Sequence, residues 1–212
     1  MTFTHFLRQQ STIAVMACMT ALAGCASAPP PLPVEWQNHV TAVSALQAWS
    51  LSGRLNIREG QQSDTVNLNW SQTNESFAIR LSGTLGLGAV HLEGDNDSVV
   101  LEKAGEEPRL LPGLDALSSE YLDYDFPAAY LRWWVRGLPV PYLPVSSTLN
   151  EQSLLQTLVQ TSPSGQRFEL SFDRYEQVQQ IALPGRINLQ SQGVTLRFLI
   201  DGWQTPASSR QP

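Results

Sequence analysis

Few residues of this chain have the types and spacing that catalysis requires. Neither His39 nor His91 lies in a motif, and the chain lacks the His-Glu-x-x-His, Gly-x-Ser-x-Gly, phosphate-loop and paired-cysteine patterns. Two carboxylate pairs, Glu106/Glu107 and Asp123/Asp125, are typical of solvated loops, although distant carboxylates can converge in space, as in glycoside hydrolases. We therefore predict that the protein is not an enzyme and holds neither a metal nor a cofactor.

The most distinctive chemistry belongs to the thiol of Cys25, which follows Leu22-Ala23-Gly24. The uncharged run over residues 11–24 is short for a membrane span and typical of a signal-peptide core. This arrangement resembles the bacterial lipobox, in which the thiol receives a diacylglyceryl group, the peptide is cut before the cysteine and the new amine is acylated. The alternative is an ordinary secretory cleavage site with a chance cysteine. We predict removal of residues 1–24, a lipidated Cys25 and, because Ala26 replaces the aspartate of inner-membrane retention signals, the outer membrane.

Charge and cysteine content narrow the possible partners. Removing residues 1–24 takes away Arg8 and no acid, so the net charge moves from −6 to −7. An acidic chain with one lysine, Lys103, is a poor candidate for binding nucleic acid or anionic headgroups. Cys18 lies in the removed peptide and Cys25 carries lipid, so we expect no disulfide and no cysteine nucleophile.

Composition divides the remaining chain into a tether, one domain and a tail. Residues 25–33 are rich in proline and predict an extended, semi-rigid tether behind the lipid. Residues 34–203 are long enough for a single domain, and residues 204–212 form a polar tail. The domain opens with apolar residues at spacings of three and four, which predict an amphipathic helix over 34–49.

From Trp49 onward the apolar residues recur at every second position, as in half-buried antiparallel strands. Gly53 interrupts the first apolar face and predicts a bend or a β-bulge. The middle of the chain instead predicts helices over 114–126 and 128–137, the second between Pro127 and Gly137. Alternation returns after residue 167, with a turn at Pro184-Gly185, whereas residues 154–158 fit either a short helix or a strand. The fold class is therefore mainly β (α+β).

The inward-facing strand residues can fill a small closed barrel or line the cavity of a wider, unclosed one, and periodicity does not separate these cases. The candidates for a lipid-binding cavity are Trp49, Leu51, Leu68, Trp70, Ile79, Leu81 and Leu196. The segment 81–90 carries three glycines and places Leu85 and Leu87 where a turn usually has polar residues. Those leucines either contact a membrane or partner, or fold back into the core.

Several segments in order resemble the LolB family of outer-membrane lipoprotein receptors. They are the lipobox at Cys25, the first strand 49–57, the hairpin 81–93 with Leu-Gly at its tip, the helix 130–139 ending in Gly-Leu-Pro, and the last strands 183–203 with a terminal Asp-x-Trp. The resemblance implies an incomplete antiparallel β-barrel with covering helices around a hydrophobic cavity. It also implies that a protruding loop leucine, here Leu85, delivers cargo to the membrane. The chain departs from the family at this loop, because Gly83-Thr84 stands where Asn-Pro is frequent.

The resemblance further implies the activity. Such a protein receives acylated lipoprotein cargo from a LolA-like periplasmic carrier, and inserts it into the outer membrane without ATP. We expect a lipid-anchored monomer that faces the periplasm of a Gram-negative bacterium. The alternatives are a structural or assembly lipoprotein whose β-domain docks a protein partner through an apolar outer face, and a lipid-anchored hydrolase, which no motif supports.

Overall fold

The computed structural model describes residues 31–83, 89–117 and 126–206. All of its helices and strands lie in one compact unit that begins at Pro33. The lipidation candidate Cys25 and the loop residue Leu85 lie outside the described residues, as do Leu87 and the pair Asp123/Asp125. Their predicted roles therefore remain predictions.

Thirteen strands, two α-helices and two 3₁₀ helices make up this described part. The elements are α2 Val34–Ser44, β1 Ala48–Glu59, β2 Gln62–Thr73, β3 Ser76–Gly83, β4 Ala89–Gly94, β5 Val99–Lys103, β6 Arg109–Leu111, η1 Leu114–Leu117, η2 Ala128–Tyr130, α4 Leu131–Trp134, β7 Val145–Leu149, β8 Leu155–Thr161, β9 Arg167–Asp173, β10 Glu176–Val178, β11 Ile181–Leu183, β12 Arg186–Ser191 and β13 Val194–Gln204.

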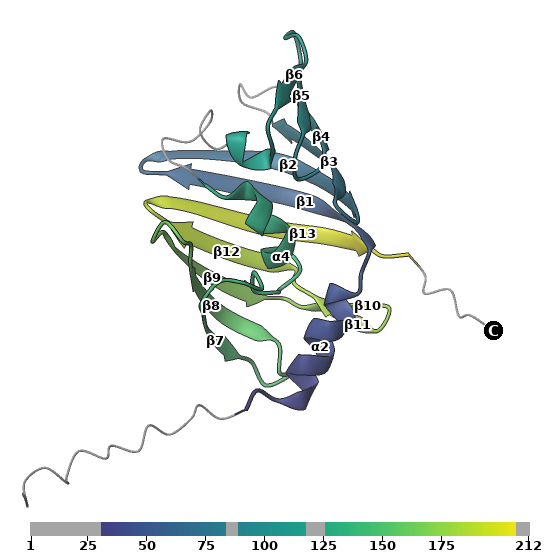
Figure 1. Ribbon diagram of the computed structural model, residues 1–212, viewed down its shortest axis with the longest axis vertical. Helices are drawn as coiled ribbons and strands as arrows, with labels where there is room; N and C mark the ends of the chain where they lie inside the picture. The colour runs from purple at the N-terminus through teal and green to yellow at the C-terminus, as the bar shows by residue number, and fades with distance from the viewer. Residues whose placement is uncertain (1–30, 84–88, 118–125, 207–212) are drawn as a thin grey trace, which may run out of the picture. The chain divides into compact units, whose positions relative to one another are not determined.

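Eleven strands form one antiparallel sheet in the order β6-β5-β4-β3-β2-β1-β13-β12-β9-β8-β7 (Figure 1). Strands β1 to β6 follow one another as a meander, and the pairing of β1 with β13 joins this half to the C-terminal half. The edge strands β6 and β7 do not pair with each other, so the sheet stays open. The helical segment with α4 and helix α2 lie on one side of this curved sheet (Figure 1). The predicted mainly β fold is confirmed.

Gly53 lies at an irregularity in the sheet, as the sequence predicted. The β1–β13 register shifts between Ser52 and Gly53, whereas β1 pairs with β2 without interruption. A Cβ atom on Gly53 would lie 2.2 Å from the carbonyl oxygen of Leu199. Glycine is therefore required here because the two backbones approach too closely for a side chain.

The first helix is shorter than its sequence pattern predicted. Helix α2 ends at Ser44, where the backbone N–H of Ala45 bonds to the carbonyl of Thr41 and that of Leu46 bonds to the carbonyl of Val43. The expected continuation to residue 49 is wrong, because β1 already begins at Ala48, which pairs with Thr73 of β2. Because β1 pairs with β2 from Ala48 onward, the last residues of the amphipathic pattern belong to the sheet.

The middle of the chain is also less helical than predicted. Of the helix expected over 114–126, the described part has only the 3₁₀ turn η1, and residues 118–125 lie outside the description. The helix expected over 128–137 is the 3₁₀ turn η2 followed by one turn of α4. Gly137, with φ +73°, ends it as predicted: its N–H bonds to the Trp134 carbonyl, and the Leu138 N–H bonds to that of Trp133. This is a Schellman C-cap.

Candidate functional site

The candidate cavity residues all lie on strands of the large sheet, at positions that face one side. Six of the seven are buried, and Leu81 is half-buried against the same core. The buried six are Trp49, Leu51, Leu68, Trp70, Ile79 and Leu196. The side of the sheet that they share is called the inner face below.

The register of the strands explains why these residues meet. Leu51 lies opposite Trp70, and Trp70 lies opposite Ile79, so β1, β2 and β3 contribute one continuous row. The ring of Trp49 lies 5.2 Å from that of Trp70 and 5.7 Å from that of Trp203. Because antiparallel partners project to the same side, a period-two pattern on each strand becomes one apolar surface.

A segment over residues 126–143, called the covering segment, packs on the inner face. Its buried apolar residues join the same core cluster as the strands, and they are Phe126, Trp134, Val135, Leu138, Val140 and Leu143. Trp134 lies 5.0 Å from Phe168 of β9 and 5.6 Å from Tyr130, measured between ring centres. The inner face is therefore covered by aromatic and aliphatic side chains rather than open to water.

A buried glutamine fixes the covering segment to the sheet. Gln160 of β8 is 1% exposed, and its side-chain oxygen accepts bonds from Trp134 Nε1 and from the Val140 N–H, both at 2.9 Å. Its amide group donates to the Val140 carbonyl at 3.0 Å. Gln160 is not among the residues expected from the sequence to be functional, but its place two residues after Leu158, on the same inward-facing side of β8, could have indicated a buried position.

A cluster of charged and polar side chains joins the covering segment to the N-terminal half of the sheet. Arg132 of α4 forms an ion pair with Glu75, in the turn between β2 and β3, and donates to the side-chain oxygen of Asn96 at 3.3 Å. The side chain of Asn96 also donates to Glu75. The hydrogen bond from Arg132 is the main reason that the pKa of the Glu75 carboxyl lies below its ordinary value.

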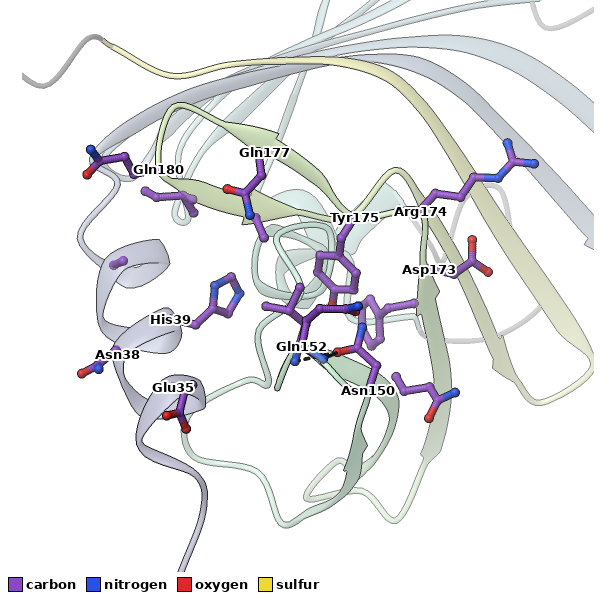
Figure 2. Close-up of a pocket in the computed structure, with 16 residues that line it drawn as sticks. Glu35, Asn38, His39, Asn150, Gln152, Asp173, Arg174, Tyr175, Gln177 and Gln180 are labelled. Atoms are coloured by element: carbon purple, nitrogen blue, oxygen red, sulfur yellow. Dashed lines mark hydrogen bonds between the residues drawn. The ribbon is translucent and has the colours of Figure 1, made fainter.

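A surface pocket of about 700 Å³ lies between α2, the β7–β8 turn and the β10–β11 hairpin. Figure 2 shows the ring of His39 pointing from α2 into this pocket, with Tyr175 opposite. Burial lowers the pKa of His39, and burial likewise raises the pKa of Tyr175, whose hydroxyl donates to the Leu155 carbonyl at 2.9 Å. Most of the labelled lining side chains carry amide or charged groups, which makes this pocket a poor place for an acyl chain. The lining does contain Phe172, Leu154 and Ile181.

Over 31–83, 89–117 and 126–206, no group of three or more His, Cys, Asp or Glu side chains is placed to hold a metal ion. Over the same ranges, no helix has the length and apolarity needed to cross a membrane.

Sequence comparison identifies relatives over nearly the whole chain. Residues 47–203 match the family described as "Outer membrane lipoprotein LolB". The chain is 35% identical over 190 residues to an outer-membrane lipoprotein LolB of Stutzerimonas stutzeri, which covers 86% of this chain and 90% of that protein. It is 33% identical over 196 residues to the LolB of Nitrosococcus oceani, covering 90% and 95% of the two chains.

Solved structures share the fold at low sequence identity. A LolA superfamily protein from Nitrosomonas europaea superposes with a TM-score of 0.54 at 7% identity, covering 82% of this chain and 95% of that chain. A putative outer membrane lipoprotein-sorting protein domain from Vibrio parahaemolyticus gives 0.55 at 8% identity, covering 82% and 92%. These likenesses support the fold, while the family rests on the sequence matches: the chain belongs to the LolB family of outer-membrane lipoproteins, which are lipoprotein-localisation proteins and not enzymes.

Proposed function

We propose that the inner face of the sheet is where this protein holds the acyl chains of its cargo. As a member of the LolB family, the protein receives lipoproteins from LolA and inserts them into the outer membrane. The observation that carries the proposal is the continuous apolar row of β1, β2 and β3 on one side of an open sheet.

The physical need for such a face follows from the cargo. Each methylene group exposed to water costs about 0.8 kcal/mol, so a lipoprotein with several acyl chains requires an apolar host in the periplasm. The outward positions of the same strands carry polar side chains, among them Arg54 of β1 and Asn69 of β2, which are exposed. Transfer of an acyl chain from water to the inner face is therefore favourable in free energy, whereas transfer to the outer face is much less so.

For an acyl chain to reach the inner face, the covering segment must move away from it. The segment 126–143 packs on the inner face through apolar contacts. The hydrogen bonds of Gln160 and the Arg132–Glu75 ion pair are its polar interactions with the sheet. Apolar contacts are non-directional, so an acyl chain can replace them with little loss of free energy. The polar interactions are directional and therefore determine the position to which the covering segment returns after the cargo leaves. In this proposal the cargo takes the place of covering side chains without creating a void.

Two residues outside the described part complete the proposal. Lipid on Cys25 holds the protein at the outer membrane, and Leu85, in the β3–β4 connection, contacts the bilayer when the cargo is released. A lipid with two or more chains gives stable anchoring, whereas one chain is marginal. We expect the protein to work as a monomer beside the membrane.

Photo-crosslinking tests the location of the acyl chains. Leu81 and Ser82 are neighbours on β3, but Leu81 packs against the core and Ser82 is exposed on the other side. A benzoyl-phenylalanine at position 81 should crosslink to an acylated lipoprotein delivered by a LolA-like carrier. The same residue at position 82 is the matched control and should give little product.

The crosslinking result also separates the proposal from a docking role. Equal crosslinking from both positions, or crosslinking from position 82 alone, would place the cargo on the outer surface and contradict the inner-face site. Cargo without acyl chains should not crosslink from position 81, since the proposal assigns that contact to the lipid.

A further inference from the structure

Arg136 is a buried cation that lacks an anionic partner among the described residues. It is 6% exposed, and within the described ranges its guanidinium donates to two neutral backbone acceptors, the carbonyls of Arg132 at 2.8 Å and Val43 at 3.3 Å. No carboxylate of the described ranges forms an ion pair with it. A buried charge without a counterion is costly, so an anion that reached this group would be strongly favoured.

Two tryptophans stabilise the cation in part. The guanidinium carbon lies 5.1 Å from the ring centre of Trp133 and 5.7 Å from that of Trp49. Aromatic faces attract cations at this range. Burial and, secondly, the charge of Arg132 lower the pKa of Arg136 to about 10, so the group still carries its charge at neutral pH.

Arg136 lines a cleft of about 210 Å³ that offers room for such an anion. The cleft, called the Arg136 cleft below, has a mixed lining. Its apolar residues are Leu46, Trp49 and Trp133, and its neutral polar residues are Ser44, Gln47, Gln72 and Asn74. A water molecule occupies about 30 Å³ in the liquid, so this volume holds about seven groups of that size. A carboxylate with a short apolar tail fits within it.

The charge of the cleft favours a monoanion. Arg132 and Glu75 also line it, but they neutralise each other as an ion pair, so that among the described residues of the lining Arg136 is the charge without an ionic partner. Guanidinium has five N–H donors in a planar fork, of which the two bonds to backbone carbonyls use two. The remaining donors suit the two oxygens of a carboxylate.

We propose that the Arg136 cleft binds a small monocarboxylate, whose carboxylate pairs with Arg136 and whose apolar tail lies against Leu46, Trp49 and Trp133. This cleft borders the acyl-chain face proposed above, since Trp49 belongs to both, but its test uses a soluble probe and does not depend on lipoprotein transfer.

Titration with sodium hexanoate tests the proposal. The probe is added to the full-length lipidated protein in phosphatidylcholine vesicles, and binding is followed by tryptophan fluorescence and by calorimetry. Trp49 and Trp133 line the cleft, so hexanoate should change the fluorescence saturably. Hexan-1-ol should give no saturable change, and inorganic phosphate should bind at least about tenfold more weakly than hexanoate.

Variants assign the binding to the guanidinium. Arg136→Gln should weaken hexanoate binding by at least about tenfold, because it removes the charge-assisted bonds. Arg136→Lys keeps the charge without the planar fork and should give an intermediate affinity, which also covers the case that the glutamine variant fails to fold. Arg54→Gln is the matched control, since Arg54 is exposed on the outer side of β1, and should bind as the parent does.

Three outcomes would overturn the proposal. They are the absence of saturable hexanoate binding to the parent protein, equal binding of hexan-1-ol, and unchanged binding by a folded Arg136→Gln protein. The absence of binding is the result expected of a purely structural arginine, which would only join the chain just after α4 to the Val43 carbonyl.

Discussion

At the residue scale, single backbone positions decide whether the sheet can form. Gly53 is one such position, because its Cα lies against the backbone of β13 at the register shift. An added methyl group would lie 2.2 Å from the Leu199 carbonyl oxygen and 2.9 Å from the Cα of Ile200. Backbone atoms cannot rotate away as the end of a long side chain can.

Gly53→Ala should therefore destabilise the protein by about 1–3 kcal/mol, the usual cost of overpacking. Denaturant unfolding followed by circular dichroism measures this difference. Gly202→Ala is the matched control, because a Cβ there would meet only the Ser52 hydroxyl at 3.5 Å, an ordinary contact. Equal stability of the Gly53→Ala protein and its parent would show that the close approach is not real.

At the element scale, the packing of the covering segment on the sheet depends on a few polar interactions. Gln160→Leu keeps a similar side-chain size but leaves the Trp134 and Val140 N–H groups and the Val140 carbonyl without their partner. Each buried polar group that loses its bond costs about 1–3 kcal/mol, so unfolding should become easier by about 3 kcal/mol or more. Gln156→Leu, at an exposed position of the same region of chain, should change stability by less than about 0.5 kcal/mol. Chemical denaturation of both variants makes the comparison, and similar losses would contradict the role given to Gln160.

The Arg132–Glu75 pair should give the covering segment an acid-dependent stability. The pKa of Glu75 is lowered in the folded protein, so the pair contributes above the ordinary pKa of a glutamate, and the contribution is lost as the pH falls through the lowered value. Because the Glu75 side chain is 62% exposed, solvent limits the contribution to at most about 1 kcal/mol at neutral pH.

Unfolding of the parent and of Glu75→Gln across pH 7 to pH 3 measures this contribution. The two proteins should differ at neutral pH and converge in acid, and high salt should reduce the neutral difference. A difference that grows as the pH falls would have the wrong sign and would refute the assignment.

Much of the sheet was predictable from the sequence because apolar and polar residues alternate along each half-buried strand. The pattern placed Trp70, Ile79 and Leu196 on inward positions, and the structure has them buried on β2, β3 and β13. Strands β6, β7 and β10 were missed, since each is short and none shows a clear alternation.

The covering segment was less predictable because its structure depends on distant partners. The short helix α4 is held by Gln160 and Glu75, which lie far from it in the sequence. The surroundings of Arg136, which forms no ion pair within the part of the chain that the structure describes, are likewise a property of the assembled fold. Local periodicity contains no information on either arrangement.

At the scale of the whole molecule, the proposed function assigns anchoring, cargo binding and release to different parts of the chain. Leu85→Glu should leave folding and acceptance of cargo unchanged but should slow release into the bilayer, because a charged side chain is costly in the apolar layer. Transfer of a labelled lipoprotein from the protein to outer-membrane vesicles measures release, with acceptance from the carrier measured separately. Normal release by the Leu85→Glu protein would reduce Leu85 to a passive loop residue.

The same division predicts that the lipid on Cys25 positions the activity without producing it. The inner face belongs to the unit that begins at Pro33, and every strand that forms it lies in that unit. Acceptance of acyl chains should therefore need the folded sheet and not the anchor.

Hand-over from a loaded LolA-like carrier to a soluble protein that begins after Cys25 tests the account most directly. The carrier and the soluble protein are mixed without ATP and then separated, and the acylated lipoprotein is located. The account predicts that the lipoprotein moves to the soluble protein and stays bound to it in the absence of membrane. Cargo that remains on the carrier, while the lipidated protein accepts it, would show that the anchor takes part in acceptance and would contradict the account.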